Sequence, residues 1–283
     1  MDYDRLKPYA EAIFNELGIV YSERNSYQLE GRLEEISKAL GYKSIEELET
    51  RSLATDQELR DLLFDKSTNN ETLFFRDRGV FDGFSKLVLP EFHKRVNGAK
   101  PMRIWSAACS TGQEPYSVAF CCEAFKKENP NFRYEILATD YSQRVLRQAK
   151  DGLFQQIEVQ RGLSSIELIQ YFSKVEDGDA TSGLWEIKPE FKAGIKFNNM
   201  NLLKEFRFPH KFDFILCRNV LIYQTPENKR KIVLKLLNVM DENSRLILGG
   251  AESLLDMSDE VKQEVIDKVI YFTRKPLNSQ ESA

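Results

Sequence analysis

The chain has 283 residues, of which 42% are hydrophobic and 30% are charged, and its formal net charge is -4. This composition suits a globular protein of one large or two modest domains, and the slight acidic excess argues against nucleic acid as a partner, since nucleic-acid-binding surfaces are basic. No apolar run reaches the length of a membrane span, and the first residues lack the apolar stretch of a secretory signal. We therefore expect a cytoplasmic protein without direct membrane insertion.

The thiols and imidazoles of the chain suggest no metal chemistry. Cys109, Cys121, Cys122 and Cys217 form no C-x-x-C pair, and the chain has only two histidines. Such a set indicates neither a metal cage nor a disulfide framework. We expect reduced thiols and no metal cofactor.

Residues 1–75 are predicted to form an N-terminal helical domain with its linker. Apolar residues recur at helical spacing from Leu6 to Leu17 and again from Leu29 to Leu40. Each run stops at a glycine, a residue that favours the end of a helix. These apolar stripes are most simply the core of a small bundle.

From residue 76 to residue 283 the pattern changes to alternating helices and strands. Strands are predicted around Ile104 and over residues 135–140, 184–187, 195–197, 212–217, 245–250 and 269–273. Such alternation predicts a doubly wound α/β sheet that is mostly parallel, with the last strand as an antiparallel edge.

Between Arg103 and Asp140 the chain has a strand, a turn of small residues, a helix and a second strand that ends on an acid. An acid in this place can accept both ribose hydroxyls of a nucleoside. The turn lacks the glycine fingerprint of dinucleotide sites, which makes a dehydrogenase a poor reading. It also carries Glu114, which would repel a pyrophosphate but suits the positive amino and sulfonium groups of S-adenosylmethionine. This segment therefore predicts a methyl-donor site; the alternative is an ordinary turn in which Glu114 favours the helix dipole and Asp140 is a cap.

Other polar residues follow the predicted strands at their carboxyl ends, where ligands of open α/β sheets bind. Arg218 and Asn219, and then Tyr223, come after the strand at 212–217. Asn201 stands in a loop after another strand, within reach of the adenine or its ribose. Capping of a helix or loop explains Arg218 and Asn219 equally well.

A polar segment with Asn70, Thr72 and Arg76 lies at the junction of the two halves. By itself it is more simply a segment that holds one domain on the other, with Arg76 paired to Glu71 or Asp77. Most surface charges have a structural role or contribute nothing measurable.

Five motifs in the same order resemble the CheR-type chemotaxis methyltransferases, bacterial enzymes that methylate glutamates on chemoreceptors. They are Asn70-x-Thr72-x-Phe74-Phe75-Arg76, STGQEPYS at 110–117, ATD at 138–140, Asn201-Leu202-Leu203 and CRNVLIY at 217–223. The resemblance runs from the helical start to the last strand. It implies a Rossmann-like class I methyltransferase domain over residues 76–283, with a small β insertion near 172–198.

Carried over by position, the resemblance implies that Asn70, Thr72 and Arg76 reach the methyl donor from the linker. It assigns Glu114 and Asp140 to the methionine and ribose ends of the donor. The residues that it assigns to the nucleoside wall are Asn201, Leu202, Arg218 and Asn219.

The resemblance also implies the reaction, which is methyl transfer from S-adenosylmethionine to glutamate carboxylates of chemoreceptors, with S-adenosylhomocysteine as the product. Arg76 and Tyr223 are then expected near the transferred methyl as the catalytic residues. The implied partner is the cytoplasmic helical region of chemoreceptors, and the enzyme is expected to be a monomer. The alternatives are a donor-binding signalling module, and a methyltransferase that acts on another protein or on a small molecule.

Overall fold

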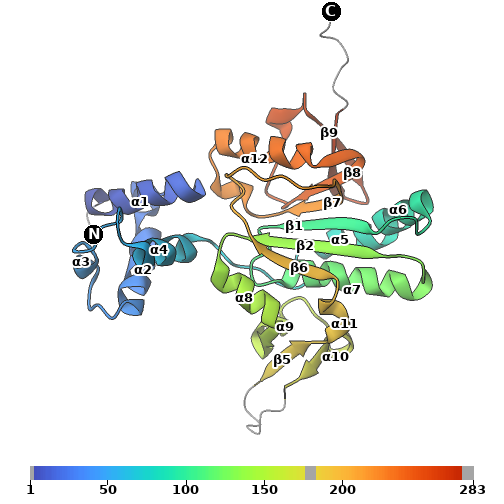
Figure 1. Ribbon diagram of the computed structural model, residues 1–283, viewed down its shortest axis with the longest axis horizontal. Helices are drawn as coiled ribbons and strands as arrows, with labels where there is room; N and C mark the ends of the chain where they lie inside the picture. The colour runs from blue at the N-terminus through green and yellow to red at the C-terminus, as the bar shows by residue number, and fades with distance from the viewer. Residues whose placement is uncertain (1–2, 176–182, 276–283) are drawn as a thin grey trace, which may run out of the picture.

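The computed structural model describes residues 3–175 and 183–275 of the chain. Figure 1 shows a bundle of helices formed by the N-terminal residues, set beside a larger part with helices around a central sheet. Within the described residues, none of the helices combines the length and the apolar character needed to cross a membrane.

The N-terminal bundle is held by its own apolar core. Its helices are α1 (Tyr3–Leu17), η1 (Glu23–Asn25), α2 (Ser26–Ala39), α3 (Ile45–Leu48) and α4 (Gln57–Ser67). Leu6, Ile13 and Leu29 from the predicted stripes are fully buried in one cluster. Helix α1 ends where Gly18 takes a left-handed φ of 71° and its amide donates to the Phe14 carbonyl at 2.8 Å, as the glycine suggested.

The larger part is built on a seven-stranded sheet in the order β6-β2-β1-β7-β8-β10-β9. Its strands are β1 (Met102–Ala107), β2 (Tyr134–Asp140), β6 (Ile195–Asn199), β7 (Phe212–Cys217), β8 (Met240–Leu248), β9 (Val261–Ile266) and β10 (Val269–Arg274). The first five strands in the sheet order pair in parallel, and β10 pairs antiparallel with both β8 and β9. The predicted Rossmann-like, mostly parallel α/β sheet is confirmed.

One detail of the sheet differs from the expectation. Strand β10 is antiparallel, as predicted, but it lies one place inside the edge because β9 pairs along its outer side. The β9 segment, VKQEVI, has only one buried residue and lacks the apolar run that reveals a buried strand.

Helices cover both faces of the large sheet (Figure 1). They are α5 (Arg78–Gly83), the π-helical η2 (Phe84–Val88), α6 (Leu89–Val96), α7 (Gln113–Glu128), α8 (Gln143–Asp151), η3 (Leu221–Tyr223), α12 (Pro226–Asn238) and η4 (Leu255–Met257). Ile104 of β1 packs into the core with α5 and α7, and its neighbour Trp105 packs into the core with α12. Side chains alternate along a strand, so a strand buried on both faces is apolar throughout.

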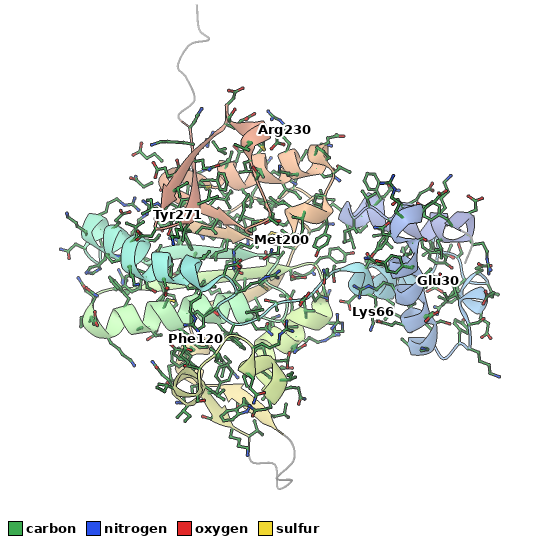
Figure 2. The ribbon with its side chains drawn as sticks, turned by 180° about the vertical axis from the view of Figure 1, so that it is seen from behind. Glu30, Lys66, Phe120, Met200, Arg230 and Tyr271 are labelled. Carbon is green, nitrogen blue, oxygen red and sulfur yellow. The ribbon has the colours of Figure 1, made fainter. Side chains whose placement is uncertain are left out.

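A smaller sheet, in the order β3-β5-β4, lies beside α7. Its elements are β3 (Leu153–Gln155), α9 (Gln156–Gln160), α10 (Ser165–Tyr171), β4 (Phe172–Lys174), β5 (Leu184–Ile187) and α11 (Pro189–Lys192). Phe120 of α7, labelled in Figure 2, stacks on Tyr171 with ring centroids 3.8 Å apart. This contact joins the unit to the helix layer of the large sheet. A small β insertion was expected near residues 172–198, and residues 176–182 of it lie outside the described residues. The small sheet begins earlier than 172, because it includes β3. Strand β6, at the end of the expected insertion, belongs to the large sheet.

Candidate active site

One cavity lies where the carboxyl ends of β1, β2 and β7 meet the linker and the helical bundle. It contains about 1060 Å³ of space, including its open mouth. Its wall includes every residue predicted for the site, namely Asn70, Thr72, Arg76, Glu114, Asp140, Asn201, Leu202, Arg218, Asn219 and Tyr223. These residues come from separate stretches of the chain, so the tertiary fold is what brings them together.

The turn after β1 presents a backbone amide to Asp140 at the end of β2. Ala108 and Ser110 take left-handed φ values of 62° and 51°. The Ser110 amide donates to one oxygen of Asp140 at 2.8 Å, and the Ser142 amide donates to the other at 3.0 Å. Burial raises the pKa of Asp140, while these amides favour its ionised form. A carboxylate oxygen has two acceptor sites, so each can still accept a ribose hydroxyl.

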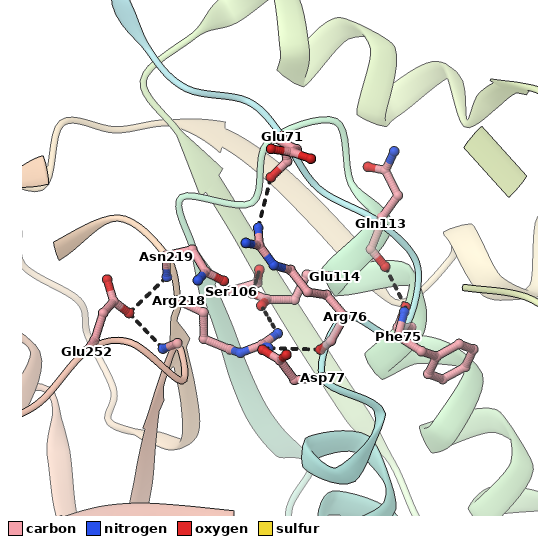
Figure 3. Close-up of polar contacts among 12 residues, drawn as sticks. Glu71, Phe75, Arg76, Asp77, Ser106, Gln113, Glu114, Arg218, Asn219 and Glu252 are labelled. Carbon is pink, nitrogen blue, oxygen red and sulfur yellow. Dashed lines mark hydrogen bonds and ion pairs between the residues drawn. The ribbon is translucent and has the colours of Figure 1, made fainter. Parts of the chain in front are cut away.

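Glu114, in the first turn of α7, is already paired within the protein. One of its oxygens accepts from Ser106 Oγ at 2.7 Å, and the other accepts from Arg218 Nη1 at 3.0 Å. Arg218 also donates from Nη2 to Asp77 Oδ2 at 2.5 Å and to the Arg76 carbonyl at 2.8 Å (Figure 3). The carboxylate of Glu114, predicted to face positive groups of the methyl donor, thus already forms an ion pair with the buried Arg218.

The Nε–H of Arg218 is an unused donor. This nitrogen is buried and has no hydrogen-bond partner among the described residues. Buried polar groups in proteins are nearly always hydrogen-bonded, so an acceptor belonging to a ligand fits at this atom. The cavity therefore presents carboxylates and arginine N–H groups together. Such a wall suits a molecule with both positive and negative groups, as S-adenosylmethionine has.

The linker turns sharply on both sides of Arg76. Phe75 and Asp77 have left-handed φ values of 50° and 59°. Phe75 is buried in the core of the larger part, and its amide donates to Ser117 Oγ at 2.9 Å. This anchoring leaves the intervening Arg76 at the wall of the cavity.

The side chain of Arg76 has no ion pair of the kind expected from the linker alone. Its Nη1 donates to the carbonyl oxygen of Glu71 at 3.0 Å (Figure 3). The carboxylates of Glu71 and Asp77 are paired with Arg161 and Arg218 instead. The guanidinium of Arg76 therefore keeps donors for a ligand.

Tyr223 stands at the mouth of the cavity, and its hydroxyl accepts from Asn69 Nδ2 at 2.6 Å. The linker also contacts the turn after β1, because Ser110 Oγ donates to the Asn70 carbonyl at 2.8 Å. Thr72 lines the same wall. The three polar linker residues predicted from the sequence, Asn70, Thr72 and Arg76, thus all line the cavity.

Asn201 is engaged with the helical bundle. Its Nδ2 donates to the carbonyl of Glu16 at 2.7 Å and to the carboxylate of Glu16 at 3.0 Å, while its Oδ1 accepts from the Leu203 amide at 2.8 Å. The side-chain amide expected to reach the nucleoside is therefore used to hold the loop on α1. Asn201 and its neighbours Met200, Leu202 and Leu203 still line the cavity.

Residues 70–270 match the family described as CheR methyltransferase, SAM binding domain. The chain belongs to the CheR methyltransferase family. It is 39% identical over 246 residues to chemotaxis protein methyltransferase 1 of Pseudomonas aeruginosa, covering 86% of this chain and 87% of that protein. It is 34% identical to chemotaxis protein methyltransferase Cher2 of Pseudomonas putida, covering 92% of each, and 31% identical to a chemotaxis protein methyltransferase of Borreliella burgdorferi, covering 89% and 88%.

Membership of the CheR methyltransferase family makes this chain an S-adenosylmethionine-dependent methyltransferase. In residues 3–175 and 183–275, no group of three His, Cys, Asp or Glu side chains is placed to hold a metal ion. The cavity lies over the carboxyl ends of the strands, where open α/β sheets bind their ligands.

Some residues at the site of this CheR-family enzyme were not predicted. Leu17, Tyr141 and Met200 line the cavity, and wall residues of this kind have no signal in a single sequence (Figure 2 labels Met200). Asn69 donates to Tyr223, but in the sequence it is one of several polar linker residues and nothing distinguishes it.

Glu252 accepts from the loop after β7. It follows the carboxyl end of β8, and a position after the carboxyl end of a strand is what identified Arg218 in the sequence.

Proposed function

We propose that this CheR-family enzyme transfers the methyl group of S-adenosylmethionine to glutamate carboxylates on the cytoplasmic helical region of chemoreceptors, forming methyl esters in chemotaxis adaptation. In this proposal it acts in the cytoplasm as a monomer, with residues 1–75 as an acceptor-facing helical domain and residues 76–283 as the donor-binding domain. The observation that carries the proposal is the meeting of linker, turn and strand-end residues around one cavity, which shares Tyr223 and Gln224 with a groove lined by α2.

The donor would be held mainly by charged groups at the strand ends. Asp140 accepts the ribose hydroxyls, and Glu114 faces the positive groups at the methionine end. Arg218 offers its free Nε–H to an acceptor on the donor. S-adenosylmethionine supplies a methyl group on a positive sulfur, and its departing half is a neutral thioether.

The acceptor would need placement more than activation. A glutamate side chain has a pKa of about 4.3, so it is already ionised at neutral pH and needs no general base. Orientation of reacting groups is worth roughly 7–11 kcal/mol in favourable intramolecular cases. Arg76 is proposed to orient a carboxylate from its periphery, because a firm grip on the attacking oxygen would stabilise the ground state. Tyr223, held by Asn69, is proposed to keep the acceptor in line.

A groove beside Tyr223 supports a helical acceptor. It runs between the helical bundle and the loop after β7, and the α2 residues that line it are Tyr27, Gln28, Gly31, Arg32 and Glu35. Tyr223 and Gln224 line both this groove and the donor cavity. A receptor helix in the groove would therefore present a glutamate side chain at the mouth of the cavity.

The test is to incubate the full chain with S-adenosylmethionine carrying a labelled methyl group and with cytoplasmic fragments of chemoreceptors. Release of labelled methanol by alkali is expected, because that release marks a carboxyl methyl ester. Receptor fragments in which the accepting glutamates are replaced by alanine should take up no label. Alkali-stable label would indicate another acceptor group, and tight donor binding without any transfer would favour the donor-binding signalling module.

A further inference from the structure

We propose that Glu252 is a positioning residue of the donor site, which sets the conformation of the loop at residues 218–223. This loop carries Arg218, Asn219 and Tyr223. Glu252 itself does not belong to the wall of the cavity. Any effect of Glu252 on the donor must therefore act through the loop, and in this respect the inference rests on the proposed roles of the loop residues.

The carboxylate of Glu252 collects backbone amides from two segments. Its Oε1 accepts from the amides of Val220 at 2.9 Å, Leu221 at 2.7 Å and Ile222 at 3.2 Å. Its Oε2 accepts from the amides of Asn219 at 2.9 Å and Gly249 at 2.7 Å (Figure 3). One side chain thus ties the loop after β7 to the end of β8.

The loop needs this acceptor for two reasons. Its amides precede or open the short helix η3, and amides at a helix start have no carbonyl partner within the helix. Asn219 also takes a left-handed φ of 59°, a conformation that a non-glycine residue keeps only when its surroundings enforce it. Glu252 is 8% exposed, so water is a poor substitute for its oxygens.

The end of β8 constrains Asn219 a second time, through shape. A Cβ atom added to Gly249 would lie 2.6 Å from Asn219 Nδ2 and 2.9 Å from the Asn219 backbone nitrogen. The φ angle of Gly249 is not positive, so its backbone conformation does not require glycine. A glycine is needed here because a side chain would collide with Asn219. The position of Asn219 is therefore fixed both by its hydrogen bond to Glu252 and by its close contact with Gly249.

The experiment compares the full chain with its Glu252→Gln variant by calorimetric titration with S-adenosylhomocysteine, which needs no receptor. The glutamine side chain of the variant would turn an NH₂ group toward amides that need an acceptor, so the loop should shift. We expect the dissociation constant to rise about tenfold or more at unchanged stoichiometry. A merely structural role would instead lower the stoichiometry and leave the dissociation constant of the folded fraction as it was.

Asp256→Asn is the matched control. It also changes a carboxylate to an amide in the same region, but Asp256 forms an exposed ion pair with Lys229 at 2.9 Å. Its donor affinity should stay within about twofold of the unmodified chain, since exposed ion pairs contribute little.

A second variant, Gly249→Ala, disturbs Asn219 by its added methyl group while the Glu252 side chain itself is unchanged, and it serves if Glu252→Gln fails to fold. It should also weaken binding of S-adenosylhomocysteine, by about fivefold or more. The inference would be overturned if folded Glu252→Gln bound S-adenosylhomocysteine as tightly as the unmodified chain. If Glu252→Gln does not fold, the same result in Gly249→Ala would overturn it. Because only product binding is measured, an error in the proposed receptor substrate would leave this result untouched.

Discussion

The guanidinium of Arg218 and the carboxylate of Glu114 meet at 3.0 Å although 104 residues separate them in the chain. Only 2% of the Arg218 side chain and 12% of the Glu114 side chain are exposed. A buried pair of this kind is costly to break, because the remaining partner becomes an uncompensated charge. The acid that suggests a methyl donor in the sequence is therefore also a structural partner of the strand-end arginine.

Replacing Glu114 by glutamine should affect both donor binding and stability. The amide loses the charge-assisted bond from Arg218, although Asp77 still pairs with that arginine. We expect the free energy of unfolding to fall by about 1–3 kcal/mol, and the dissociation constant of S-adenosylhomocysteine to rise about tenfold. Denaturant unfolding and calorimetry measure the two effects.

The control for that change is Glu91→Gln, which removes an exposed carboxylate paired with Arg245 at 2.6 Å. Its effect on stability should be below about 1 kcal/mol, with donor affinity unchanged. If Glu114→Gln kept full donor affinity, Glu114 would have no role in donor binding and would serve only as the structural partner of Arg218.

Arg76→Ala should lower turnover far more than it weakens donor binding. The carbonyl oxygen of residue 76, which accepts from Arg218, remains in the variant, so the donor wall stays in place. The guanidinium that would orient the acceptor is lost, and misplacement of a reacting group can cost about 100-fold in rate. Single-turnover methylation of receptor fragments measures the rate, with Arg230→Ala, which removes a half-exposed arginine paired to Glu260, as the control. Unchanged turnover would remove Arg76 from the mechanism.

Donor binding should weaken at acidic pH through Asp140. Burial raises the pKa of Asp140, and only its ionised form can accept hydrogen bonds from both ribose hydroxyls through acceptor-only oxygens. Affinity should be level above that pKa and should fall as the pH drops through it, by up to about tenfold per pH unit. Calorimetry across pH measures this, and Asp140→Asn should bind weakly with no such dependence. A pH dependence that survives in Asp140→Asn would assign the titration to another group.

The contact between Asn201 and Glu16 predicts an order of effects on donor affinity. Asn201→Ala removes both bonds to α1 and should weaken donor binding most, because the loop after β6 loses its anchor. Glu16→Ala keeps the carbonyl bond and should have a smaller effect. The double variant should match Asn201→Ala, since contacting residues are not additive. Additive losses would mean that the two residues act separately; Lys204→Ala, which removes an exposed ion pair with Glu16, is the control.

The strands that position the site were predictable because they are buried on both faces. The 212–217 segment reads as an apolar run with one acid, and the 135–140 segment has the short apolar run Ile136-Leu137-Ala138 before its terminal acid. The structure places β7 and β2 there, on either side of β1. Strand β9 was missed because polar residues interrupt its pattern. Its partner β10 was consequently taken for the edge, since only the pairing of the whole sheet reveals which strand lies outermost.

The sequence by itself pointed to the donor class, because a turn without phosphate-binding glycines, Glu114 and an acid at the next strand end lie in one βαβ unit. The order of five short motifs along the chain then determined the family. The sequence also pointed to the strand ends, because parallel strands bring their carboxyl ends to one edge. Only the tertiary structure decided the partner of each side chain. Arg218 with Glu114, Asn201 with Glu16, and Glu252 with the loop after β7 join distant segments. Such choices depend on burial and on backbone turns, which no local pattern specifies.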